Sequence, residues 1–234
     1  MIAFGRRRPG GAFAFAAAGT ISGASDSGAG EITMSPGAPS GVLVGSFLVI
    51  HVCVNAPATT ITSFTTPSGW TAGGGANDAG DTIGSRLFYR WATGAAADTP
   101  NVVANTDATG SYAACRIYRF TGGIGSGDPR DDTTFEHQAA STTLNAVDIT
   151  TTVNNELACQ FVSVLAYVGA TGAFTGESGV DYTEAATANT TESSDMTLQL
   201  QTGSIATAGA ITGGTYTLAS SKMKQVIALG LKPS

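Results

Sequence analysis

Hydrophobic residues along the chain occur in short runs, and glycine, proline, serine and threonine separate one run from the next. The run from Val42 to Val54 is rich in valine, isoleucine and phenylalanine and follows the turn-rich segment Pro36–Gly41. Such composition and boundaries predict a β-strand. From Ser85 to Trp91 apolar and polar residues alternate, with Leu87, Tyr89 and Trp91 on one face and Arg86, Phe88 and Arg90 on the other. This period of two is typical of a half-buried antiparallel strand.

The rest of the body shows the same kind of pattern, and helical periodicity is missing from it. Further strands are predicted at Ile61–Thr66, Asn101–Asn105, Tyr112–Phe120, Asp148–Thr152, Glu156–Val168, Met196–Gln201, Thr215–Leu218 and Met223–Leu231. Short strands at regular spacing with turns between them predict an all-β, antiparallel β-sandwich, here jelly-roll-like.

The second half of the chain repeats the pattern of the first half at an offset of about 110 residues. The matched segments are Phe47–Val52 with Glu156–Phe161 (offset 109), Trp70 with Tyr182 (112), Arg86–Arg90 with Met196–Leu200 (110) and Cys115–Phe120 with Val226–Leu231 (111). Self-similarity at a fixed period indicates an internal structural repeat. We therefore predict one two-sheet sandwich with pseudo-twofold character, in which Trp70 and Tyr182 occupy equivalent corners.

The repeat also sets the predicted domain boundaries. The β-sandwich domain covers residues 41–234, with repeat halves at about 41–121 and 148–233 and a linker around 122–147. Residues 1–40 have no full counterpart in the repeat, so we predict that they form an extended N-terminal arm.

Composition makes a surface that packs against neighbours the favoured interpretation. Charged residues are only 12% of the chain, against about 25% in an average soluble domain. Serine, threonine and alanine side chains lose little rotamer entropy when another surface covers them. The net charge of −6 argues against nucleic acid as a partner, because phosphate binding needs clustered lysine and arginine. No apolar stretch approaches the roughly 18 residues of a membrane-spanning helix.

Residues with catalytic potential are few and scattered. The two histidines, His51 and His137, have no adjacent serine, cysteine or acidic pattern, so we predict neither a catalytic residue nor a zinc site. Asp128, Asp131 and Asp132 could offer oxygen ligands to calcium, but Asp-Pro-Arg-Asp-Asp reads more simply as a solvated turn. We accordingly predict no metal and no cofactor.

Two other chemistries are open at this level. A carboxylate pair for glycoside hydrolysis could form in space from Glu136, Glu156, Glu177, Glu184 and Glu192, although no motif supports it. The three cysteines Cys53, Cys115 and Cys159 fall in predicted strands without a pairing pattern. We interpret them as buried, reduced thiols.

The N-terminus has the layout of a signal peptide. Arg6, Arg7 and Arg8 precede the apolar segment Ala12–Gly19, as a basic region precedes the apolar core of a leader. We favour a different interpretation, an uncleaved anchoring arm with Phe13 and Phe15 as apolar plugs and the arginines as polar clamps on a partner subunit. The alternative is an arm that folds back on its own domain.

Three segments in order resemble a family of phage and prophage β-proteins. Val44–Val49, Thr66–Thr71 and Leu87–Ala92 are similar to that family's "GDLLVA", "PSGWT" and "YYRVA" motifs, and Ile227–Pro233 is similar to its "ALALRP" ending. The resemblance covers residues 40–233. The chain departs from it at Ser46, where the family usually has aspartate, and at Val180-Asp181-Tyr182, in place of a second tryptophan. The resemblance implies a virion structural protein and not an enzyme.

The predicted function follows from that resemblance and from the arm. We expect a capsid decoration or cement protein, assembled in the host cytoplasm, that docks on the major capsid protein and forms a homo-oligomer such as a trimer. The alternative is a tail fibre or spike accessory protein that binds host-surface glycans, with Trp70, Trp91 and Tyr182 as the stacking residues. A polysaccharide-active enzyme is the weakest of the three hypotheses.

Overall fold

The computed structural model describes residues 11–26, 30–56, 61–76, 83–94, 99–106, 110–123, 126–166, 172–190 and 195–233. These residues form β-strands and turns, and none of them is helical. The strands pair antiparallel throughout. The prediction of an all-β, antiparallel sandwich is therefore confirmed.

The first half of the chain forms two sheets. The first main sheet has the order β1 (Ala14–Ala18), β9 (Tyr112–Thr121), β4 (Phe47–Asn55), β7 (Ile83–Trp91), β6 (Thr71–Ala76), and β2 (Ser22–Ser25) also pairs with β9. The first outer sheet has the order β3 (Glu31–Met34), β8 (Val102–Thr106), β5 (Ile61–Thr65).

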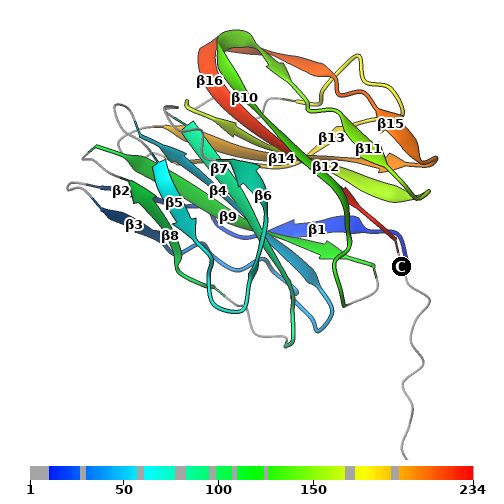
Figure 1. Ribbon diagram of the computed structural model, residues 1–234, viewed down its shortest axis with the longest axis horizontal. Coiled ribbons are helices and arrows are strands. Elements are labelled where there is room, and N and C mark those ends of the chain that lie inside the picture. The colour runs from blue at the N-terminus through cyan, green and yellow to red at the C-terminus, as the bar shows by residue number, and fades with distance from the viewer. Residues whose placement is uncertain are drawn as a thin grey trace, which may run out of the picture.

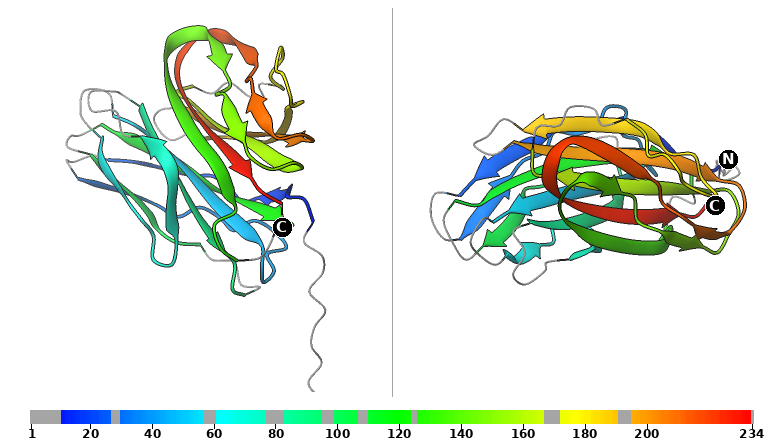
Figure 2. Two further views of the ribbon diagram at one scale, coloured as in Figure 1. Left: turned by 45° about the vertical axis from the view of Figure 1, so that its right-hand side comes forward. Right: turned by 90° about the horizontal axis from the view of Figure 1, so that it is seen from above.

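The second half of the chain forms two more sheets. The second main sheet has the order β10 (Arg130–Asn145), β16 (Thr215–Leu231), β12 (Glu156–Val164), β14 (Met196–Ile205), β13 (Thr183–Thr190). The second outer sheet pairs β11 (Ile149–Thr151) with β15 (Gly209–Ile211). Figures 1 and 2 show the two halves side by side, with their main sheets facing each other.

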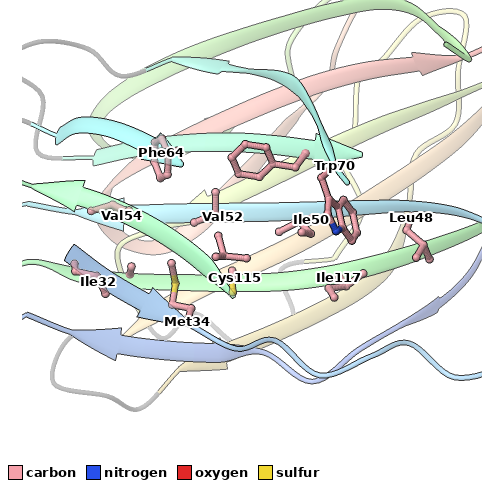
Figure 3. Packing of buried hydrophobic residues seen from close by; sticks show 14 of the residues in the cluster. Ile32, Met34, Leu48, Ile50, Val52, Val54, Phe64, Trp70, Cys115 and Ile117 are labelled. Carbon is pink, nitrogen blue, oxygen red and sulfur yellow. The ribbon is translucent and has the colours of Figure 1, made fainter. Parts of the chain in front are cut away.

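Three apolar layers hold the four sheets together. Figure 3 shows part of the first, where Leu48, Ile50 and Val52 of β4 pack against residues of the first outer sheet and Trp70. An equivalent layer joins the second main and outer sheets. The third lies between the two main sheets and includes Phe47 and Phe161. The sheets are thus stacked in the order outer, main, main, outer, and each half is a sandwich of its own. The predicted single two-sheet sandwich has to be corrected on this point.

The stacking explains why the central strands are continuously buried. In β4 every residue except Asn55 is buried, and in β12 every residue is buried. A strand covered on both faces has no solvent side on which polar residues would be favoured. The alternation predicted for Ser85–Trp91 serves two different cores, because Leu87 and Tyr89 lie between the main sheets and Phe88 faces the first outer sheet.

Strand pairs are nested in the same way in both halves. In the first half β2 pairs with β9, β3 with β8 and β4 with β7. In the second half β10 pairs with β16, β11 with β15 and β12 with β14. Pairing of the first strand with the last, and so on inward, is the wrapping of a jelly roll. A complete jelly roll would have one more pair inside these three. That pair is not formed here, because β6 and β13 add to the main sheets beside β7 and β14.

The register allows the two halves to be aligned residue by residue. Phe47 lies between Phe120 and Trp91 in the first main sheet, and Leu157 lies between Leu231 and Ser204 in the second. Phe47 and Leu157 both belong to the layer between the main sheets. This alignment gives an offset of 110 (157 − 47), so the predicted pairing of Phe47 with Glu156 is one residue out of register. A slip of one residue would exchange the two faces of the strand.

The glycine run in β6 brings the two halves into contact. A Cβ atom on Gly74 would overlap the Thr133 Cγ2 methyl of β10. Gly73 is the extra residue of a bulge in the β6–β7 pairing, and the Arg130 guanidinium donates a hydrogen bond to its carbonyl oxygen. The run Gly73–Gly75 therefore allows β10 of the second half to approach β6 of the first.

Replacing Gly74 by alanine is expected to lower the free energy of unfolding by about 1–3 kcal/mol, the usual cost of overpacking. Thr133→Ser removes the Cγ2 methyl, so the double variant should recover part of that loss. Gly11→Ala is the control, because no atom lies within 4 Å of a Cβ placed there. Urea unfolding of the four variants measures the coupling, and strictly additive effects would contradict the contact between β6 and β10.

Candidate functional site

The predicted anchoring residues divide into two groups. Arg6, Arg7 and Arg8 lie outside the described residues. Phe13 is only 4% exposed, and its ring centroid lies 5.7 Å from that of Phe47 and 6.0 Å from that of Trp91. Phe15, in β1, lies 6.1 Å from Phe120 by ring centroids. The prediction that these two rings plug into a partner subunit has to be corrected, because they pack on the chain's own first main sheet.

The predicted arm therefore ends earlier along the chain than residue 40. Residues 14–34 contribute β1, β2 and β3, which pair with β9 and β8. From Ala14 onward the alternative prediction describes the structure, with the N-terminal segment folded on its own domain.

Two of the three predicted glycan-stacking residues are buried in the two half-sandwiches. Trp70 precedes β6 and is 7% exposed, with the Arg90 guanidinium 5.6 Å from its ring centroid. Tyr182 precedes β13 and is 2% exposed, and its hydroxyl accepts a hydrogen bond of 2.9 Å from Gln160 Nε2. They occupy matching positions in the two halves. Their assignment to glycan stacking has to be corrected, because neither presents a ring face to solvent.

Trp91, the third predicted stacking residue, is half-buried at the end of β7. Its indole Nε1 donates to the Gly127 carbonyl oxygen over 2.7 Å, and its ring packs against Phe13 and Phe47. The residue thus fixes the segment that connects the halves to the first main sheet.

One end of the stack brings the N-terminal segment next to residues of the second half. We call it the entry end and define it as the end at which β4 and β12 begin. A cavity of about 230 Å³ lies there, lined by Ala12, Phe13, Asn155, Glu156, Ser204, Ile205 and Ala206. A second, more polar cavity of about 300 Å³ adjoins it at Ser204. Figure 1 places the C-terminal end of the chain beside β1 in the same region.

Two carboxyl groups meet behind the cavity. Glu156, the first residue of β12, is 1% exposed, and the Asp131 carboxyl of β10 lies close enough to influence its titration. Burial first and Asp131 second raise the pKa of Glu156 to about 7. Burial also acts to raise the pKa of Asp131, but hydrogen bonds from the Thr152 hydroxyl and amide outweigh it, and the net shift is downward.

The aspartates predicted to form a solvated turn are all occupied within the chain. Asp128 forms an ion pair of 2.7 Å with Arg130, whose guanidinium lies 4.5 Å from the Tyr89 ring centroid. Asp131 accepts hydrogen bonds from Thr152, and Asp132 accepts one of 2.8 Å from the Thr150 amide. Among the described residues, no group of three or more His, Cys, Asp or Glu side chains is arranged to hold a metal ion.

A polar cluster that the sequence did not predict lies between the two main sheets. His51 Nε2 lies 2.9 Å from Ser163 Oγ, which lies 3.0 Å from Ser85 Oγ. All three residues are 0% exposed. Burial lowers the pKa of His51 to about 3, so the imidazole is neutral at physiological pH. A histidine beside a serine is the geometry of nucleophile activation, but a substrate cannot reach this one. We interpret the cluster as a polar contact that fixes how the sheets stack.

The cysteine prediction is confirmed. Cys53, Cys115 and Cys159 are all free and buried. Burial raises the pKa of the Cys53 thiol to about 11, and it raises the pKa of the other two thiols as well. These thiols are therefore protonated and act as small apolar side chains.

Exposed apolar side chains mark the entry end. Leu43 and Val44, in the turn before β4, are 63% and 72% exposed, and Val153, in the turn before β12, is 39% exposed. Leu43 and Val153 are 110 positions apart, which is the offset that relates β4 to β12. The two halves thus present apolar side chains at matching turns.

Comparisons with known proteins add no relative. No protein-family model, no curated protein and no solved structure matches the chain. No helix long and apolar enough to cross a membrane occurs in the part of the chain that the structure describes.

Proposed function

We propose that the protein is a structural component of a bacteriophage particle, a capsid decoration protein that docks through residues ahead of Gly11. The observation that carries this proposal is the anchoring of Phe13 at the entry end. Phe13 packs against Phe47 and Trp91, and the Gly11 carbonyl oxygen accepts a hydrogen bond of 3.0 Å from the Gly123 amide. The ten residues that precede Gly11 include three arginines, and they are joined to the body at Gly11.

The surroundings of that point support a docking role. Leu43, Val44 and Val153 are exposed on the turns before β4 and β12, so a docked partner could cover apolar side chains from both halves. The body is suited to serve as a rigid module, since its two main sheets are covered on both faces. Jelly rolls recur in viral capsid proteins, although fold alone does not determine function.

Many copies and several contacts per copy would supply the affinity. A symmetric homo-oligomer, such as a trimer, would present several N-termini to the capsid at once and gain affinity by multivalency. The surface rich in serine, threonine and alanine costs little side-chain entropy to cover. The glycan-binding alternative loses Trp70 and Tyr182 as contacts, because both rings are buried.

Deletion of residues 1–10 tests the proposal more sharply than deletion of the whole predicted arm. The shorter deletion keeps Phe13 and Phe15, so its unfolding midpoint should match that of the full chain. Its incorporation into phage particles should fall at least tenfold, because the proposed clamp is removed. Co-sedimentation with purified particles measures this loss. Phe13→Ala is the control, because it keeps residues 1–10: its unfolding midpoint should fall, but its incorporation into particles should not fall tenfold. Undiminished incorporation of the deletion variant would contradict the docking role.

A further inference from the structure

The Glu156 carboxyl group is placed where one of its oxygens needs a proton. Oε1 accepts a hydrogen bond of 3.0 Å from the Val153 amide. Oε2 is buried, and no donor among the described residues reaches it. It faces the backbone at Gly230, where an added Cβ atom would lie 3.0 Å from Oε2 and 3.7 Å from Asp131 Cβ. Gly230 thus leaves room for the two carboxyl groups to meet.

Asp131 is the partner that remains ionised. The Thr152 hydroxyl donates to its Oδ1 over 2.6 Å, the Thr152 amide donates to Oδ2, and Lys232 Nζ lies 3.7 Å from Oδ1. These donors stabilise the charged form of Asp131. Two buried carboxylates in contact repel each other, and the pair is most stable when it holds one proton. That proton lies on Glu156, which then donates to Asp131.

The pair connects elements that lie far apart in the sequence. Asp131 is at the start of β10, directly after the segment that joins the halves, and Thr152 and Val153 are in the turn before β12. Lys232 follows β16 near the C-terminal end. Glu156 itself lines the cavity that Phe13 and Ala12 close from the first half. A change in the protonation of the pair would therefore affect the cavity wall on which Phe13 lies.

We propose that Glu156 and Asp131 form a shared-proton latch, which holds the entry end together when the pair carries a proton and loosens it when the proton leaves. This inference does not depend on the docking function. Above neutral pH, ionised Glu156 would face ionised Asp131 without a donor between them. The turn before β12 and the wall beside Phe13 would then open first.

Other charged groups near the pair do not replace this proton. Lys232 is the one cation that the described residues place beside it, and it faces Asp131. The Asp132 carboxylate is directed to the Thr150 amide, and Arg130 is paired with Asp128. The remaining cavity wall consists of Ala12, Phe13, Asn155, Ser204, Ile205 and Ala206, none of which titrates.

The direction of the pH effect follows from linkage. The pKa of Glu156 is raised from 4.5 to about 7, so the folded protein binds more protons than the unfolded chain between these values. Its contribution to stability is fully present below pH 4.5 and is lost as the pH rises through 7. Asp131, with its lowered pKa, acts only at more acidic pH. The buried His51 acts in the opposite direction below pH 6.5, so the wild-type curve alone would conceal the latch.

The test compares the full-length wild type with Glu156→Gln, whose amide can donate to Asp131 at any pH. Between pH 5 and pH 8 the unfolding constant of the wild type, divided by that of the variant, should rise roughly 50- to 100-fold. Glu31→Gln, at an exposed position of β3, is the matched control and should leave the wild-type dependence unchanged. A flat ratio between wild type and Glu156→Gln would overturn the proposal.

A second measurement separates the latch from a merely structural carboxyl group. Carbon-13 NMR of the side-chain carboxyls should show one glutamate that titrates near neutral pH in the wild type. That resonance should move to lower pH in Asp131→Asn, because the new amide donates to Glu156 in place of the proton. A Glu156 resonance that titrates in the same range with and without Asp131 would also overturn the proposal.

Discussion

Replacing Phe161 by alanine is expected to lower the free energy of unfolding by about 3–5 kcal/mol, the usual cost of removing a buried phenylalanine ring. The Phe161 side chain is 0% exposed. Its ring lies between the two main sheets, 5.6 Å from the His51 ring and 5.5 Å from the Tyr118 ring by centroids, both edge-on. The loss should be large because rigid sheets on both sides of the ring cannot collapse into the cavity.

Phe135→Ala is the matched control, since that ring is 45% exposed on β10. Its removal should cost less than about 1 kcal/mol. Guanidinium unfolding of both variants at pH 7 gives the comparison. Equal effects at the two positions would show that Phe161 is not in a packed interface between the halves.

Acid is expected to destabilise the protein through His51. Burial lowers the pKa of His51 from 6.5 to about 3, so the folded protein binds fewer protons than the unfolded chain between these values. The stability that His51 contributes is complete above pH 6.5 and is lost as the pH falls toward 3, by about 3 kcal/mol at pH 4. The physical reason is that a charged imidazole would have to form between two apolar sheets.

His51→Gln removes this titration and keeps a side chain that can hydrogen-bond to Ser163. Both proteins are best compared in the Glu156→Gln background, where the opposing titration of Glu156 is absent. Unfolding free energies between pH 4 and pH 7 should fall with acid for His51 and stay level for glutamine. Parallel curves would mean that His51 is not what makes the stack acid-sensitive.

Much of the fold could be predicted from local pattern. The continuous run at Val42–Val54 and the alternation at Ser85–Trp91 predict strands because side-chain period follows directly from strand geometry. Trp70 and Tyr182 were expected at matching corners, and each directly precedes a matching edge strand. The two main sheets also have matching strand orders, with β9, β4, β7 and β6 in one and β16, β12, β14 and β13 in the other.

The stacking of four sheets could not be predicted in the same way. A strand such as Glu156–Val164 shows that both of its faces are buried, but not what covers them. The bounds of the repeat predict a linker around 122–147, yet residues 130–145 form β10, which pairs with β16 over most of its length. The long partner strand β16 stabilises this segment, although the composition of the segment itself does not indicate a strand.

Long-range side-chain contacts could not be predicted from the sequence either. His51 meets Ser163 across 112 positions, and Asp131 meets Glu156 across 25. The sequence suggests Asp131 as a calcium ligand and Glu156 as a member of a carboxylate pair for hydrolysis, but no spacing rule connects these two residues with each other. Glu192, another of the acidic candidates, lies outside the described residues. Register between strands brings such pairs together, and register is a property of the whole sheet.

The copy number of the chain in purified phage particles tests the central claim, an assembly role, most directly. Quantitative mass spectrometry against the major capsid protein would supply it. The proposal predicts a fixed ratio that corresponds to hundreds of copies per particle and persists through repeated purification. A chain that is absent from the particles, or present in only a handful of copies, would contradict its role as a capsid decoration protein.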